Sequence, residues 1–84
     1  MRYTISYDLK APGKDYQTLW NALAAIGAKR VLESEWVANR TGTDTVKLRD
    51  HFRQFMDSND RILVTELDGP GWAGFNLMTD LNAI

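Results

Sequence analysis

The segment from Arg2 to Asp8 constrains the fold more than any other part of the chain, because apolar and polar residues alternate in it without interruption. A two-residue period is that of a β-strand with one buried and one exposed face. The strand is predicted to end in an acid, Asp8, directly before a loop over residues 10–13. Its buried face is predicted to carry three large side chains, those of Tyr3, Ile5 and Tyr7.

Two later stretches have helical periodicity. After the first loop, apolar residues recur at i, i+3, i+4 and i+7, which predicts an amphipathic helix over Lys14–Ile26. Gly27 suits the position that ends many helices. A second apolar stripe predicts a helix that follows the capping sequence Thr41–Asp44 and runs to about Asp57.

Three further strands are predicted. Residues 28–40 are interpreted as two strands with a bend near Glu33–Glu35. Arg61–Leu67 has the strongest strand character of the chain, and the turn residues Asp68–Gly71 end it. The remaining Trp72–Ile84 is an apolar tail that is too short to fold alone and must pack on its own protomer or across a dimer.

The predicted order is β-α-β-β-α-β followed by the apolar tail. This is the ferredoxin-like pattern, an α+β fold with an antiparallel sheet and both helices on one face. Residues 1–84 are expected to form a single domain. The other sheet face is expected to be open to a partner.

Composition excludes several classes of site. The chain has no cysteine and one histidine, so it has no disulfide frame and lacks the usual ligands of a zinc site. Its net charge of −1 lacks the basic excess of proteins that coat phosphate backbones. No apolar run approaches the ~20 residues of a membrane span, and the N-terminus lacks a signal-peptide layout, so the chain is expected to be cytoplasmic, without a membrane partner.

Asp8 has two interpretations. As a carboxylate at a strand end, it has the oxygen ligands that Mg²⁺ prefers. As an Asx residue before a loop, it also suits a turn cap that accepts backbone N–H bonds.

The motifs around Asp8 resemble those of a known family. The matching pieces are Ile5–Leu9, Gly27–Val31 and Ser34–Trp36. In this order they resemble the CRISPR-associated protein 2 family and the related virulence-associated protein D toxins, over about the first half of the chain.

The resemblance implies a ferredoxin-like fold and a homodimer formed through the open sheet face and the C-terminal segment. It also implies a Mg²⁺-dependent endonuclease acting on RNA or DNA, in which Asp8 is the catalytic and metal-binding residue and meets its copy near the dimer axis. Other members of the family bridge DNA-handling partners without catalysis.

Basic and aromatic residues supply the remaining candidates. Four arginines are candidate nucleic-acid contacts, although the acids between them equally predict a salt-bridged surface. Trp72 and Phe75 of the tail are candidate dimer-interface anchors. His51 is expected to be a partly buried structural residue at the edge of the apolar stripe of the second helix. The four arginines proposed above as nucleic-acid contacts are Arg30, Arg40, Arg49 and Arg53.

Three functions therefore remain open. The first is a divergent homodimeric module of the CRISPR-associated protein 2 type with Mg²⁺-dependent nuclease activity. The second is a non-catalytic homodimeric adaptor that binds protein or nucleic acid. The third is a ferredoxin-like domain that senses a small molecule.

Overall fold

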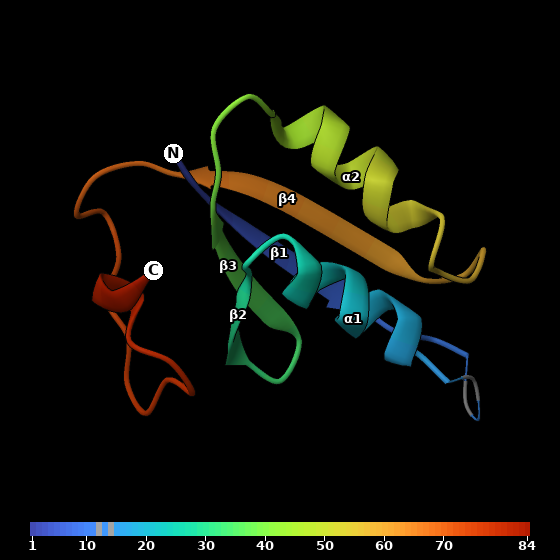
Figure 1. The fold of residues 1–84 in the computed structure, drawn as a ribbon. Helices are drawn as coiled ribbons and strands as arrows, with labels where there is room; N and C mark the ends of the chain where they lie inside the picture. Colours follow the sequence, from blue (N-terminus) through green and yellow to red (C-terminus); the bar gives the residue numbers. More distant parts are fainter. Residues whose placement is uncertain (12, 14) are drawn as a thin grey trace.

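The computed structural model describes residues 1–11, 13 and 15–84. Four strands and two α-helices alternate in it in the order β-α-β-β-α-β, and a short 3₁₀ helix follows (Figure 1). The elements are β1 (Arg2–Asp8), α1 (Gln17–Ala25), β2 (Lys29–Leu32), β3 (Glu35–Asn39), α2 (Thr45–Arg53), β4 (Arg61–Leu67) and η1 (Leu81–Ala83).

The strands form one antiparallel sheet in the order β2-β3-β1-β4. The chain is thus an α+β protein whose layout is compatible with a ferredoxin-like fold. The central strand β1 pairs with β3 and with β4, so that Arg2 lies opposite Asn39 on one side and Leu67 on the other. At its far end, Asp8 lies opposite Arg61.

The alternation in β1 has the predicted effect. Its three aromatic and aliphatic side chains are at most 5% exposed, and they pack with residues of both helices into one core. The prediction for β4 is confirmed in both bounds, and the bend between β2 and β3 falls at Glu33–Ser34, as predicted. The helical contributors to the core include Leu19, Leu23, Leu48 and Phe52.

Both helices are shorter than predicted. The predicted start of α1 at Lys14 lies outside the described residues, as does Pro12 of the predicted loop, and the observed helix begins at Gln17. The predicted end of α2 at Asp57 is wrong, because the chain tightens after Arg53 into i→i−3 bonds, in which the amide of Phe55 donates to the carbonyl of Phe52. Tight last turns of this kind are common at helix ends.

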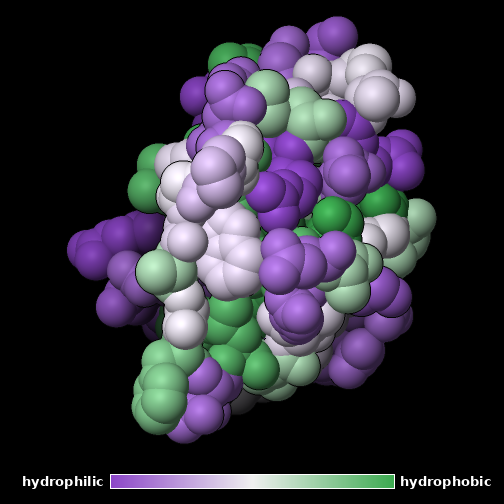
Figure 2. Space-filling view, turned by 90° about the vertical axis from the view of Figure 1, so that its left-hand side faces the viewer, coloured by the Kyte–Doolittle hydropathy of each residue, from purple (hydrophilic) through white to green (hydrophobic). Residues whose placement is uncertain are grey.

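The C-terminal segment, Trp72–Ile84, packs on its own sheet. Leu81 is 5% exposed and shares a second hydrophobic cluster with Val31 and Val37, on the face that the helices leave uncovered. Figure 2 shows the side of the molecule on which the segment lies in Figure 1, and hydrophobic atoms gather in the lower half of this view. Within the described residues, no helix has the length and apolar character needed to cross a membrane.

Candidate functional site at the end of the first strand

Asp8 is an exposed carboxylate at the end of the central strand. Its Oδ2 atom lies 3.7 Å from Nη1 of Arg61 across the β1–β4 pair, and the two side chains are 58% and 74% exposed. An ion pair this long and this exposed contributes little to stability. The carboxylate is therefore accessible to a ligand.

A shallow hollow lies beside this carboxylate. The β2–β3 turn brings Ser34 to it, because the amide of Tyr7 donates to the carbonyl of Ser34 at 3.0 Å. Ser6 lies on the same face, and its hydroxyl donates to the Glu35 carboxylate. The hollow is lined by Ser6, Tyr7, Asp8, Ser34, Arg61, Ile62 and Leu63.

In one protomer, the residues that line this hollow include one carboxylate, that of Asp8. Among the described residues, no group of three or more His, Cys, Asp or Glu side chains is placed to hold a metal ion. A Mg²⁺ ion at Asp8 would also meet the guanidinium of Arg61. One protomer thus fits such an ion poorly, and a second copy of Asp8 would be needed to complete the ligand set.

A different acid, Asp60, directly before β4, stabilises the turn that follows β1. The Oδ1 atom of Asp60 accepts from the amide of Lys10 at 2.6 Å and from the hydroxyl of Tyr16 at 2.8 Å, and its Oδ2 accepts from the amide of Asp57 at 2.7 Å. Burial, followed by the hydrogen bond to Asp60, raises the pKa of the Tyr16 phenol. Sequence reasoning missed this junction, whose one visible signal is the helix-breaking run before β4.

Arg30 is engaged within the protein. Its Nη2 atom donates to the hydroxyl of Tyr7 at 3.3 Å and to the carbonyl of Glu33 at 2.6 Å. Its guanidinium carbon lies 5.1 Å from the ring centre of Trp20 and 5.6 Å from that of Trp36. This geometry makes Arg30 a packed structural residue, and its role as a nucleic-acid contact stays a prediction.

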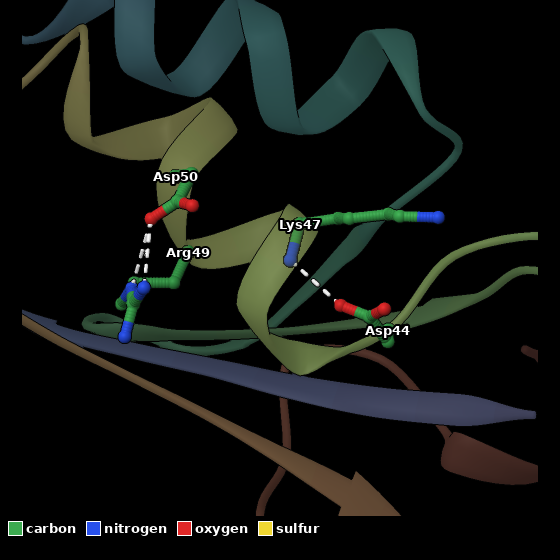
Figure 3. A network of polar contacts seen from close by, with 4 residues as sticks. All are labelled: Asp44, Lys47, Arg49 and Asp50. Carbon is green, nitrogen blue, oxygen red and sulfur yellow. Dashed lines mark hydrogen bonds and ion pairs between the residues drawn. The ribbon is translucent and has the colours of Figure 1, made fainter.

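The other three arginines predicted to contact nucleic acid have partners different from those of Arg30. Arg40 donates to the carbonyl of Ile26 at 3.3 Å. Arg49 and Arg53 lie on α2, and Nη2 of Arg49 is 2.9 Å from the Asp50 carboxylate. Figure 3 shows this ion pair beside the Asp44 cap of the same helix, an arrangement typical of a salt-bridged helix surface.

The two aromatic residues predicted at an interface lie in different environments. Trp72 is partly buried against the cluster of Val31, Val37 and Leu81. Phe75 is 85% exposed. His51 lies edge-on to Phe52 and Phe55 on α2, but it is exposed, so the prediction of a partly buried histidine is wrong.

No protein-family model matches the chain. The resemblance to CRISPR-associated protein 2 therefore rests on the short motifs around Asp8.

Proposed function

We propose that the chain is a ferredoxin-like homodimeric module of the CRISPR-associated protein 2 type, in which two Asp8 carboxylates share a Mg²⁺ ion and cleave a phosphodiester bond of RNA or DNA. The observation that carries the proposal is the position of Asp8. Its exposed carboxylate lies at the rim of a hollow, at the end of the sheet that the C-terminal segment leaves uncovered.

The strand order supports the fold of the proposed module, and one exposed apolar side chain supports its dimer. The order β2-β3-β1-β4 with antiparallel pairs throughout is what a ferredoxin-like βαββαβ chain forms. Leu63 is 62% exposed and lines the same hollow as Asp8. In a dimer, Leu63 would provide an apolar contact with the second copy, and Asp8 would provide a metal ligand that both copies share.

The chemistry follows from the paired carboxylates. A two-fold axis would supply the second acid that one chain lacks. A bound Mg²⁺ polarises a phosphoryl oxygen and lowers the pKa of an attacking water. Asp8 would hold the ion, and Arg61, once displaced from Asp8, would contact the phosphate.

Nuclease assays on short RNA and DNA, with Mg²⁺ or a chelator, test this function. Asp8→Asn should abolish cleavage and leave the dimer intact. Asp50→Asn is the matched control, because Asp50 is also an exposed acid in an ion pair, but on α2. Cleavage that persists in Asp8→Asn, or a wild-type protein that sediments as a monomer at all concentrations, would contradict the proposal.

A second candidate is a non-catalytic adaptor. The ion pair with Arg61, together with the single carboxylate of the hollow, favours a surface that binds without reacting. In that case Asp8→Asn would keep both dimer and partner binding. The assay distinguishes the two functions, because the adaptor gives no Mg²⁺-dependent cleavage in the wild-type protein.

A further inference from the structure

The two edge strands of the sheet, β2 and β4, differ in what lies beside them. The C-terminal segment covers the edge of β2, where the amide of Met78 donates to the carbonyl of Val31 at 2.9 Å. Among the described residues, none outside the sheet forms a backbone–backbone hydrogen bond with β4. This strand also contains no lysine, proline or bulge, which are the usual features that prevent an edge strand from pairing with another chain. The outer edge of β4 is therefore open to a further strand.

The register of β1 shows which groups of β4 point away from the sheet. The amide of Tyr7 donates to the carbonyl of Ser34, on the side of β3, and the backbone groups of successive residues point to opposite sides of a strand. The even-numbered residues of β1 therefore bond to β4, and their partners there are the odd-numbered residues. The amides and carbonyls that remain at the outer edge are those of Ile62, Val64 and Glu66.

These three residues are symmetric about Val64. A two-fold axis beside Val64 and perpendicular to the sheet would place a second β4 strand antiparallel to the first. Val64 would then lie opposite its own copy, and Ile62 opposite Glu66 of the second copy. All six residues would form backbone bonds across the axis, and no other antiparallel register of the two strands pairs all of them. The open edge is thus complementary to itself.

Apolar side chains flank this axis. Val46 of α2 is 53% exposed, and it lines a hollow at the edge together with Ile62, Leu63 and Val64. Because the axis passes beside Val64, the hollows of the two copies would adjoin there. Each exposed Val46 would then be covered by the second copy, and burial of such apolar surface favours association.

Glu66 and Arg53 are two opposite charges that one chain keeps apart. Neither side chain forms a hydrogen bond or an ion pair among the described residues. Arg53 ends α2 and lines a second hollow beside Ile62, which is four residues, or about 13 Å, along β4 from Glu66. In the paired strands, Glu66 of the second copy would lie opposite Ile62 and near Arg53. The two-fold axis repeats this contact, so each dimer would contain it twice.

The other charged side chains around this second hollow already have partners within the chain. Arg49, which lines the neighbouring hollow, is 2.9 Å from the Asp50 carboxylate. Asp57 and Asp60 line the second hollow as well, but both accept hydrogen bonds within the turn before β4. Among the described residues, Arg53 is consequently the charged residue of this hollow whose side chain is free to bind an acid.

We propose that β4 pairs with β4 of a second copy of this chain about a two-fold axis at Val64, which joins the two four-stranded sheets into one. The interface lies on the side of β4 away from β1, so it leaves Asp8 and the open sheet face free. It is therefore separate from the dimer of the proposed function and does not depend on it. A chain with both interfaces forms species larger than a dimer.

Hydrogen exchange resolved by residue tests the pairing. The amides of Leu63 and Thr65 bond to β1 and should be protected at every protein concentration. Those of Ile62, Val64 and Glu66 should exchange freely in dilute protein and become protected by about tenfold or more as the protein associates. Outward amides that remain unprotected in concentrated protein overturn the edge pairing.

Two charge reversals test the contact between Glu66 and Arg53. Arg53→Glu and Glu66→Lys, each alone, would set like charges against each other across the axis and should weaken this association by about tenfold in sedimentation velocity. An equimolar mixture of the two variants should restore it, because every such contact in the mixed dimer joins opposite charges. A folding defect in either variant would not be repaired by mixing. Lys47→Glu is the matched control and should change nothing, because the Lys47 side chain is directed away from that of Arg49 (Figure 3).

The mixing experiment also separates this interface from the one at Asp8. A mixture that associates no better than either variant overturns the edge pairing. If the chain has both interfaces, Arg53→Glu should reduce the larger species to the dimer of the proposed function. Reduction to a monomer instead supports the edge pairing and contradicts that function.

Discussion

The buried indole nitrogen of Trp36 donates to the hydroxyl oxygen of Tyr7 at 3.1 Å. The indole nitrogen of Trp20 donates to the same oxygen at 3.1 Å, and Arg30 adds a third donor. The Tyr7 hydroxyl in turn donates to the carbonyl of Glu33 at 3.3 Å. One phenol thus joins β1, α1 and the β2–β3 turn directly beside Asp8.

Tyr7→Phe should destabilise the protein by about 2–3 kcal/mol, because it leaves the buried Trp36 indole without its acceptor and removes three further bonds. Tyr3→Phe is the matched control, since the Tyr3 hydroxyl makes one bond, to the carbonyl of Thr43. Its cost should be about 1 kcal/mol. Urea unfolding of both variants measures the difference, and equal costs would show that the Tyr7 cluster adds nothing beyond a single bond.

The raised pKa of Tyr16 predicts a loss of stability at alkaline pH. The folded protein binds the phenolic proton more tightly than the unfolded chain does, whose tyrosines titrate near pH 10. The contribution of Tyr16 is therefore fully present below pH ~10 and is lost as pH rises through the folded pKa. Unfolding measured between about pH 8 and 11 should show a steeper decline in wild type than in Tyr16→Phe. Parallel curves would contradict this linkage.

Two acids should respond differently to neutralisation. Asp8→Asn should change the free energy of unfolding by less than about 0.5 kcal/mol, since its ion pair is long and exposed. Asp60→Asn should cost about 1–3 kcal/mol, because Asp60 accepts two bonds that join separate segments and a third within its own turn. Chemical denaturation at neutral pH checks both. A destabilised Asp8→Asn would instead make Asp8 a structural residue.

Two glycines near the C-terminus should tolerate alanine differently. A Cβ added at Gly74 would lie 2.4 Å from Cδ1 and 2.8 Å from Cγ of Leu77, so Leu77 would have to move. We expect Gly74→Ala to cost about 1–3 kcal/mol, as overpacking does. At Gly71 the nearest atom is the Asp68 carbonyl oxygen, at 3.5 Å, an ordinary contact. Thermal unfolding of the pair should separate them, and similar melting temperatures would show that the Leu77 side chain moves aside at no cost.

The strands were the most predictable part of this fold. The alternation in β1 and the β-branched run of β4 are local signals, and both strands follow them. The end of α2 was less predictable, because Phe55 and Met56 reach the core from a tight turn as well as from a helix. The packing of the C-terminal segment depends on partners far away in the sequence, so the residues alone left it open.

The candidate site also contains residues that local sequence predicts and residues that it does not. The position of Asp8 at a strand end follows from the local pattern. The engagement of Arg30 does not, because its partners Tyr7, Trp20 and Trp36 come from three separate elements. The role of Asp60 likewise depends on a loop far away in the sequence. Interactions of this kind exist only once the chain has folded.

The central position of β1 has a consequence for biosynthesis. This strand is made first, but one of its two neighbours is β4, and residues 2 and 67 face each other in the completed sheet. A chain emerging from the ribosome must therefore leave one edge of this aromatic-rich strand unpaired until β4 is available. Such non-local pairing slows folding and leaves hydrophobic surface exposed meanwhile. Nascent chains stalled before residue 61 should accordingly be the ones that chaperones bind.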